Sequence, residues 1–458
     1  MTIAWTSYKQ WLESTLLSPL PENQPCPLPG DLSTNSRTLQ SGQWFLPLKG
    51  TQFDGHDYIE EAIKNGAAGT FSERQVSSTV PMILVKNTLD TYHSIAGGWR
   101  STLPSIKTVA LTGSLGKTTV KTMTSLMLAT QGETFSTPGN QNNEFGIPKS
   151  VLNLKADHKF SVFELGARHP NDISTLVKIV QPNVSACLNI ASPHQEIFGC
   201  REMTMNTKLE ILKDAPPQCK GVVLYDDPTL LEKAKKIKKD LITFGFDKRA
   251  AIFIQSHHIE NEMLLVGLNI FGKNLEVSLS LYHESFPINL AAAFAITEAL
   301  GVSSETCVKG LEHFKGLPGR FKIHRRPSYT VVDDSYNASP ESMKAGIKSL
   351  FKLFPKRKKV LILGEMFELG PSSDKKHREI GSFCAQEKPD FLVTVGNHAR
   401  LLADEAEKRG FPKKSVQRFD DVSELLDSIH SINNKGDLFY VKGSRKVQLD
   451  LVVAQLIS

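Results

Sequence analysis

The chain has 458 residues, a formal net charge of +6 and 40% hydrophobic residues. One hydrophobic core seldom fills that length, so two or three domains are expected, and the ordinary apolar fraction excludes a mainly disordered protein. The six cysteines are scattered without a C-x-x-C pair, which excludes a small disulfide scaffold and provides no zinc signature.

Targeting signals and concentrated charge are both missing from the sequence. No stretch approaches 18 uninterrupted apolar residues, so no transmembrane helix is predicted. The first 17 residues lack the cationic start and apolar core of a secretory signal. The positive excess permits an anionic ligand, whereas a nucleic-acid-binding protein would show a basic stripe. A cytoplasmic protein with reduced thiols is therefore expected.

The first region, residues 1–103, is rich in turn residues and predicts a mixed α/β domain. Short apolar runs alternate with Gly, Asp and Ser before a helix predicted over Asp57–Asn65, which Gly66 should end. A strand within 77–87 and a helix over 88–102 are predicted to follow.

The second region, residues 104–318, alternates strand-like and helix-like segments. The run Thr108–Leu111 is a short buried strand by composition, and helical periodicity starts at Thr118. This alternation predicts a parallel sheet with crossover helices. The further segments are strands within 160–166, 184–190 and 220–227, and helices within 169–180 and 289–301.

The third region, residues 319–458, repeats this alternation and predicts a second, smaller α/β domain. Its boundaries are set by composition, because no low-complexity linker separates the regions. The predicted strands lie within 329–335, 359–365, 391–397 and 437–444, and the predicted helices within 340–351, 377–386 and 397–410.

The strongest local signal is T-G-S-L-G-K-T-T at 112–119, between a predicted strand and a predicted helix. Glycines let backbone N–H groups close around phosphate oxygens, and the helix N-terminus favours negative charge. Lys117 can then reach β/γ-phosphates and Thr118 can bind Mg²⁺. The strict G-x-x-x-x-G-K-[ST] pattern fails because Leu111 replaces its first glycine. A glycine turn with an exposed lysine is the alternative, but nucleotide binding is favoured.

This loop resembles the ATP loop of the Mur ligases, the ATP-dependent amide ligases of peptidoglycan precursor synthesis. The sequence segments that carry the resemblance occur in that family's order. They are 137–148, 163–170, 188–199, 207–211, 318–320, 331–343, 361–370 and 441–445, with a uridine-nucleotide-binding pattern over 35–69.

The resemblance implies three α/β domains: an N-terminal mixed domain for the UDP-sugar, a central P-loop ATPase domain with a parallel sheet, and a C-terminal Rossmann-like domain. DDSYNASPESM (333–343) and GEMFELG (364–370) resemble the branch that joins D-alanyl-D-alanine to UDP-N-acetylmuramoyl-tripeptide through an acyl phosphate. A monomer is expected.

Three alternative functions stay open. A sibling Mur ligase or a folylpolyglutamate-type ligase would add a single amino acid. A P-loop kinase or GTPase would need no amine acceptor, and the N-K-x-D motif of guanine-selective members is missing. A binding protein that kept the fold would not need Lys117, Glu164, His194 and Lys208.

Two residues are candidate Mg²⁺ ligands from their chemistry: Glu164, which ends a predicted strand, and Thr118. Both side chains offer the oxygen ligands that Mg²⁺ prefers. The resemblance adds His194 at a second Mg²⁺ and Lys208 as a carbamylated lysine; a solvated loop histidine and a surface helix lysine are the alternatives. Lys117, Lys208 and His194 are the implied catalytic residues. The implied ATP-binding residues are Gly113, Ser114, Gly116, Lys117, Thr118, Thr119, Asn289, Arg320, Asp334 and Asn337.

Several of these residues also suit a structural role. Asn289 is a good helix N-cap, and Asp333-Asp334 fits a turn after a strand. Ser285-Phe286 replaces the His-Asn pair expected just before Asn289.

The resemblance also implies contacts to the UDP-sugar peptide, from residues that are equally ordinary turn formers. Asn35 stands where the family generally has Asp, and His377 with 442–445 is placed near the dipeptide. The implied substrate residues are Ser36, Arg37, Gly50, Asp54, Gly55, His56, Asn142 and Asn143.

Overall fold

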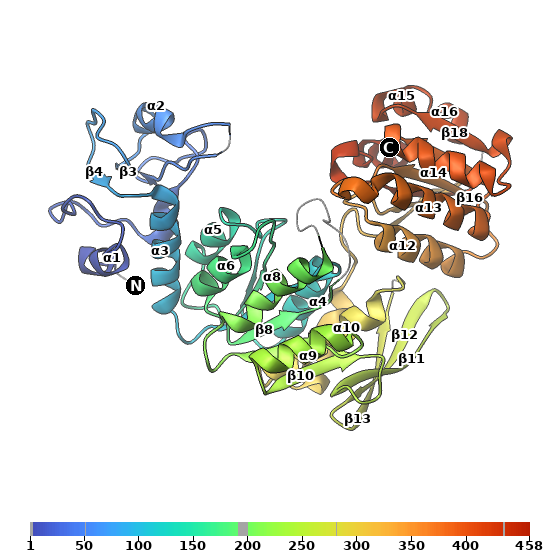
Figure 1. The fold of residues 1–458 in the computed structure, drawn as a ribbon. Coiled ribbons are helices and arrows are strands. Elements are labelled where there is room, and N and C mark those ends of the chain that lie inside the picture. The colour runs from blue at the N-terminus through green and yellow to red at the C-terminus, as the bar shows by residue number, and fades with distance from the viewer. Residues whose placement is uncertain (1–2, 51, 191–199, 281, 434–435) are drawn as a thin grey trace.

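The computed structural model describes residues 3–50, 52–190, 200–280, 282–433 and 436–458. Its strands form three separate sheets of four, nine and six strands. Figure 1 shows the three groups of elements in a row in chain order, with the middle sheet between the blue N-terminal and the red C-terminal elements. The predicted α/β class is confirmed.

The first sheet is parallel in the order β1-β2-β3-β4. The helix predicted over Asp57–Asn65 forms as a 3₁₀ turn followed by α2, and the chain leaves it at Gly66 with a φ of 96°. The bounds are α1 Trp5–Trp11, β1 Leu32–Ser33, β2 Trp44–Phe45, 3₁₀ turn Gly55–Tyr58, α2 Ile59–Lys64, β3 Gly69–Ser72, β4 Met82–Leu84 and α3 Thr88–Ser101.

The middle sheet has the order β13-β12-β11-β10-β9-β8-β5-β7-β6. The predicted parallel arrangement is confirmed for β5 to β10, whereas β11, β12 and β13 extend it as an antiparallel meander that was not predicted. The bounds are β5 Lys107–Thr112, α4 Lys117–Ala129, β6 Thr134–Ser136, α5 Gly146–Leu152, β7 Phe160–Glu164, α6 Asp172–Val180, β8 Val184–Cys187, α8 Arg201–Lys213, β9 Lys220–Leu224, α9 Pro228–Ile237, β10 Leu241–Gly245, β11 Ile252–Glu260, β12 Met263–Ile270, β13 Lys273–Leu279, α10 Phe286–Ala299, α11 Ser304–Cys307 and 3₁₀ helix Val308–His313.

The third sheet has the order β14-β15-β19-β16-β17-β18, and only β14 runs antiparallel to its neighbour. All four strands and all three helices predicted for this region form. The bounds are β14 Lys322–Arg325, β15 Thr330–Asp333, α12 Pro340–Leu353, β16 Lys359–Gly364, 3₁₀ helix Gly370–Ser372, α13 Ser373–Glu387, β17 Phe391–Val395, α14 Asn397–Lys408, 3₁₀ helix Lys413–Ser415, β18 Val416–Phe419, α15 Val422–Asp427, α16 His430–Asn433, β19 Leu438–Lys442, 3₁₀ helix Arg445–Val447 and α17 Asp450–Ile457.

The first and second sheets share a hydrophobic core. One continuous cluster of buried side chains runs from Trp5 to Ala234, whereas two separate clusters, between Phe321 and Leu456, cover the third sheet. Helix α3 crosses the shared boundary, where Arg100 is only 4% exposed. Its guanidinium donates hydrogen bonds to the carbonyls of Val180 (3.0 Å), Leu103 (2.7 Å), Ile106 (3.2 Å) and Gln181 (3.4 Å).

Helix α10 is buried along most of its length and packs on α4 and the middle sheet. It begins at Phe286 after Ser285, so Asn289 is its fourth residue and the N-cap hypothesis for Asn289 is wrong. Pro287 in the first turn explains the earlier start, because that position needs no intrahelical N–H. Within the described residues no single helix could span a membrane; only the bent pair Phe286–Ala299 and Ser304–His313 passes that test, and only by length and composition.

Candidate active site

The phosphate loop lies between β5 and α4 as the sequence predicts. Gly116 has a φ of 79°, and a Cβ there would lie 2.5 Å from Oδ1 of Asn289, so α10 approaches the loop closely. The Lys117 ammonium donates to the carbonyls of Gly113 (2.8 Å) and Ser114 (3.2 Å). Burial lowers the pKa of Lys117, with Glu164 opposing and Arg320 adding to the effect. The Lys117 ammonium therefore lies within the loop, at the helix N-terminus that favours a bound anion.

Asn189 fastens the loop from the neighbouring strand. Its Oδ1 accepts a hydrogen bond from the Leu115 N–H (2.9 Å), and its Nδ2 donates to the Leu115 carbonyl (2.9 Å). Its own carbonyl accepts the Ser114 N–H at 3.1 Å. Asn189 is not among the predicted site residues, although its position just after β8, beside β5, could have indicated it.

Glu164 ends β7 and is 4% exposed. Its Oε1 accepts a hydrogen bond from Nδ2 of Asn142 (3.1 Å). Among the described residues its buried Oε2 has no hydrogen-bond partner, and the nearest cation, Lys121, has its Nζ 4.0 Å away. A buried carboxylate oxygen without a partner is costly unless a cation or donor joins it. This oxygen, together with the Thr118 hydroxyl, fits a divalent cation.

Lys208 lies on α8 and is 4% exposed, so the surface-lysine hypothesis is wrong. Burial lowers its pKa to about 7; Lys117 adds to this shift and Cys187 opposes it. His194 falls in 191–199, outside the described residues. Among the described residues no group of three or more His, Cys, Asp or Glu could hold a metal ion.

Arg320 connects the third unit to the phosphate loop. Its Nη2 donates to the Thr118 hydroxyl at 3.1 Å, and its guanidinium lies 4.3 Å from the centroid of the Tyr336 ring. A second cation thus already lies beside the loop. Thr119, the last residue of the motif, is buried in the first turn of α4 at 7% exposure.

Both aspartates after β15 are engaged within the third unit. Asp334 Oδ2 accepts from the Tyr440 hydroxyl (2.7 Å) and pairs with Lys442 (2.8 Å), and its Oδ1 accepts the Phe321 N–H (3.2 Å). Asp333 accepts from the Gly319 N–H and from Ser335, as the turn hypothesis predicts. Asn337 is exposed, and its carbonyl accepts from Lys442 (3.0 Å).

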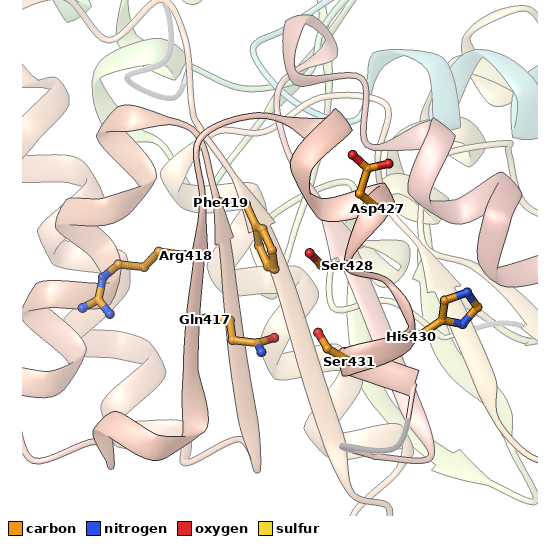
Figure 2. A pocket seen from close by; sticks show the side chains of 7 residues that line it. All are labelled: Gln417, Arg418, Phe419, Asp427, Ser428, His430 and Ser431. Atoms are coloured by element: carbon orange, nitrogen blue, oxygen red, sulfur yellow. The ribbon is translucent and has the colours of Figure 1, made fainter.

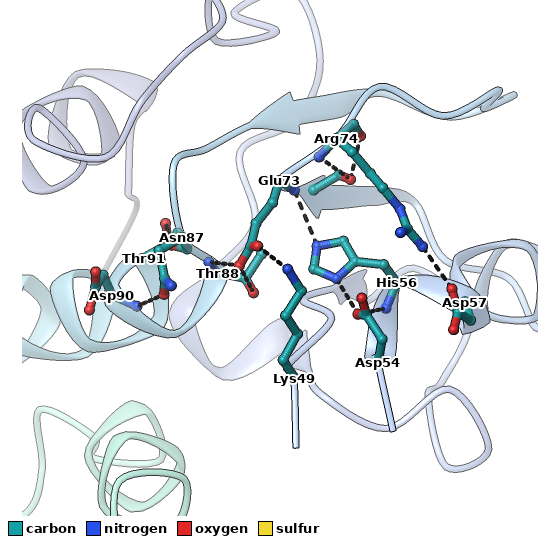
Figure 3. Close-up of polar contacts among 11 residues, drawn as sticks. Lys49, Asp54, His56, Asp57, Glu73, Arg74, Asn87, Thr88, Asp90 and Thr91 are labelled. Atoms are coloured by element: carbon teal, nitrogen blue, oxygen red, sulfur yellow. Dashed lines mark hydrogen bonds and ion pairs between the residues drawn. The ribbon is translucent and has the colours of Figure 1, made fainter. Parts of the chain in front are cut away.

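Asp54 and His56 form part of a polar network in the first unit (Figure 3). Asp54 Oδ1 accepts from the backbone N–H (2.9 Å) and from Nδ1 of His56 (2.6 Å), and Nε2 of His56 accepts the Glu73 N–H (3.1 Å). Burial acts to raise the pKa of Asp54, but the bonds from His56 lower it. Glu73 in turn pairs with Lys49 (2.5 Å) and accepts from Thr88. The network ties Lys49, Asp54 and His56 to Glu73.

The other predicted uridine-site residues have local partners in the first unit. Ser36 is buried and donates to Glu61 (3.3 Å), while Arg37 is exposed. Asn35 Oδ1 accepts the Arg37 N–H at 3.0 Å, an acceptor role that the family's aspartate can also fill. Gly50 donates to the Phe53 carbonyl, and a Cβ on Gly55 would lie 2.6 Å from the Leu48 carbonyl oxygen.

Two further predicted residues have local partners. Asn143 is exposed, and its Oδ1 accepts the Gly146 N–H at the start of α5 (2.9 Å), the turn-forming role. His377 is fully buried: its Nε2 accepts the Met366 N–H (3.0 Å) and its Nδ1 lies 2.9 Å from the Ser373 carbonyl. Both ring nitrogens of His377 are engaged, so this residue holds the GEMFELG loop.

Two shallow hollows lie away from the phosphate loop. One, of about 540 Å³, is lined by β18 and the α15–α16 segment, with Arg418 and Asp427 at its sides (Figure 2). The other, of about 600 Å³, lies between the start of α6, α8 and α9. Neither brings together the predicted site residues.

Comparison with known protein families matches most of the chain. The Mur ligase family, catalytic domain, matches residues 31–94; the Mur ligase middle domain matches 111–297; and the Mur ligase, glutamate ligase domain, matches 319–445. The UDP-N-acetylmuramoyl-tripeptide–D-alanyl-D-alanine ligase of Bacillus subtilis is 31% identical, and that of Escherichia coli 30% identical, each over 93% of both chains.

Solved structures show the same similarity. MurF from Acinetobacter baumannii superposes with a TM-score of 0.89 at 29% identity, over 100% of this chain and 99% of that one. MurF ligase from Thermotoga maritima, in complex with ADP, has a TM-score of 0.83 at 31% identity over 93% and 96%. Mycobacterium tuberculosis folylpolyglutamate synthase, at 15% identity and a TM-score of 0.62 over 78% and 92%, shares the fold alone.

Proposed function

The chain belongs to the Mur ligase family, and on that premise we propose that it joins D-alanyl-D-alanine to UDP-N-acetylmuramoyl-tripeptide with hydrolysis of ATP. The observation that carries this proposal is the buried Glu164 carboxylate beside the phosphate loop, in a chain 31% identical to a ligase of that name over 93% of its length. The products are the pentapeptide precursor of peptidoglycan, ADP and phosphate.

The chemistry runs in two transfers. A carboxylate oxygen of the tripeptide attacks the γ-phosphorus of ATP, the bond to the bridging oxygen breaks, and ADP leaves. The amine of D-alanyl-D-alanine then attacks the acyl carbon, phosphate leaves, and the nitrogen loses a proton. Both transfers concentrate negative charge, so cations and oriented N–H groups stabilise them.

Lys117 and the loop N–H groups are the main donors. In the structure Lys117 is bonded to the carbonyls of Gly113 and Ser114. We infer that it exchanges these carbonyls for β/γ-phosphate oxygens when ATP binds. The remaining loop residues, Ser114, Gly116, Thr118 and Thr119, close around the phosphates.

Mg²⁺ is the proposed cofactor, held by Thr118 and Glu164, with His194 and Lys208 at a second ion. When bound, it neutralises phosphate charge. Carbamylation would turn Lys208 into an anion suited to this place. Carbamylation needs a neutral lysine amine. Lys208 supplies one near neutral pH because burial lowers its pKa to about 7.

We propose the domain division 1–103, 104–318 and 319–458, with the third domain closing over ATP. Arg320, which already contacts Thr118, would bind the ATP phosphates. Asn289 would contact the adenine. Asn337 is exposed, whereas Asp334 would have to leave Tyr440 and Lys442 to reach ribose. Closure would exclude water from the acyl phosphate.

The first domain would hold the UDP-sugar, and Asn142 and Asn143 would face the peptide. The proposed UDP-sugar contacts are Ser36, Arg37, Gly50, Asp54, Gly55 and His56. We propose that His377 supports the dipeptide site indirectly, through the backbone of Met366. We also propose that the protein is a monomer and acts in the cytoplasm, where both nucleotides occur.

The decisive experiment measures phosphate release with each substrate omitted in turn. The proposal expects release only when UDP-N-acetylmuramoyl-tripeptide and D-alanyl-D-alanine are both present. Release with a single amino acid in place of the dipeptide would instead identify a sibling or folylpolyglutamate-type ligase, and release that needs neither substrate would contradict ligation.

A further inference from the structure

Lys121 is a buried lysine next to the phosphate site that the reaction as described leaves without a role. It lies on α4, one helical turn after Lys117 and on the same face. Only 4% of it is exposed. A buried ammonium is costly unless it is paired and hydrogen-bonded, so its surroundings indicate what it does.

The Lys121 ammonium joins three parts of the site. Its Nζ donates to the Thr137 carbonyl (2.6 Å) and lies 3.4 Å from the Gly139 carbonyl oxygen, at the start of the loop over residues 137–143. It also lies 4.0 Å from Oε2 of Glu164. Burial acts to lower the pKa of Lys121, and Glu164 opposes that shift.

The loop over residues 137–143 is fastened at a second point. Asn142 Nδ2 donates to Oε1 of Glu164 (3.1 Å), and the Asn142 carbonyl accepts the Gly166 N–H (2.7 Å). Gly139, with a φ of 51°, turns the chain between the two attachments. Lys121 and Glu164 therefore hold the loop at its start and near its end.

We propose that Lys121 is a positioning residue. It fixes the positions of the loop over residues 137–143 and of the Glu164 side chain relative to the phosphate loop. It acts on the reaction through these two groups and does not bind phosphate itself. Because α4 carries both Lys117 and Lys121, the helix couples the nucleotide end of the site to the loop proposed to face the UDP-sugar peptide.

The geometry separates this role from that of a second phosphate lysine. Nζ of Lys117 lies against carbonyls of the phosphate loop itself, whereas Nζ of Lys121 is directed to carbonyls of a different segment. Reaching phosphate would cost Lys121 its bond to the Thr137 carbonyl and leave that carbonyl without its ammonium donor.

The inference rests on the proposed function, and its test is Lys121→Met, which keeps the stem and removes the charge and donors. We expect amide hydrogen exchange over residues 137–143 to accelerate at least tenfold while the centre of α4 stays protected. The dissociation constant of ADP should change less than about threefold. The KM for UDP-N-acetylmuramoyl-tripeptide should rise and kcat should fall, for a combined loss of about 10- to 100-fold, because a small displacement of reacting groups is sufficient.

Two further variants sharpen the test. Lys155→Met removes an exposed lysine from the same unit and should change none of these quantities. In the double variant Lys121→Met/Asn142→Ala, amide exchange over residues 137–143 should accelerate little more than in the worse single variant, because both side chains hold one loop. Should Lys121→Met fail to fold, Lys121→Gln, which keeps one donor for the Thr137 carbonyl, is measured in the same way.

The outcomes are distinct. Unchanged exchange in the loop would overturn the inference, as would ADP binding weakened tenfold or more, which would indicate direct phosphate contact. A lower unfolding temperature with unchanged loop exchange and KM would reduce Lys121 to a structural residue and also overturn it. If wild-type protein binds ADP but does not ligate, the proposed function fails, while the exchange data still decide the role of Lys121.

Discussion

Replacing Arg100 with Met should loosen the joint between α3 and the middle sheet. Three of the bonds that its guanidinium donates are 2.7 to 3.2 Å long and end on main-chain carbonyls. Hydrogen bonds from charged groups contribute about 1.5–3 kcal/mol each. At about 1.5 kcal/mol each, these three bonds predict a loss of about 4.5 kcal/mol. Methionine removes the desolvation cost of a guanidinium whose pKa burial lowers, so about 3 kcal/mol is expected.

Urea unfolding followed by tryptophan fluorescence measures this loss. All four tryptophans, at positions 5, 11, 44 and 99, lie in the first 99 residues, so the signal follows the first unit and α3. Arg74→Met is the matched control, because Arg74 is half exposed and pairs with Asp57 at the surface, a contact expected to contribute less than about 1 kcal/mol. Equal unfolding midpoints for the two variants would refute the reasoning.

The remaining predictions concern the phosphate site. Lys117→Ala should lower substrate-dependent phosphate release by at least about 10³-fold because it removes the main cation facing developing charge; a near wild-type rate contradicts this role. Glu164→Gln should raise the Mg²⁺ concentration for half-maximal rate by about tenfold, measured by Mg²⁺ titration, and an unchanged titration argues against Glu164 as a ligand. Because burial lowers the pKa of Lys208 to about 7, its amine is neutral above that pH and protonated below it. Enzyme depleted of CO₂ should therefore regain activity faster at pH 8 than at pH 6 when the concentration of dissolved CO₂ is kept equal, and equal rates would argue against carbamylation.

Sequence patterns predict the elements of this chain where local and tertiary preferences agree. The run Thr108–Leu111 is buried on both faces of its sheet, so its composition was sufficient to identify β5. The glycines and Lys117 likewise mark the phosphate loop. No element was predicted over the meander of β11 to β13. Strand β12 alternates buried and more exposed residues, but Met263 and Leu265 on its more exposed face are apolar too, so the sequence alternation is weak.

Predictions of side-chain roles were limited by partners that the sequence does not mark. Lys121 and Arg100 both bond to main-chain carbonyls of distant segments, and any residue type supplies a carbonyl. His377 matched a motif, but its burial against the Met366 N–H depends on how α13 packs under the loop. Lys208 looked like a surface lysine because α8 carries polar residues on several faces.

The hydrophobic cluster that runs from Trp5 to Ala234 has a consequence for biosynthesis. The first sheet is complete in sequence by Leu84, yet its core closes only when strands and helices more than a hundred residues later have left the ribosome. At about 5–20 residues per second, α3 and the strands before it wait roughly ten seconds or longer with apolar surface uncovered. The third sheet has its own clusters and can fold as soon as it emerges, so the nascent chain is most exposed to aggregation early in its synthesis.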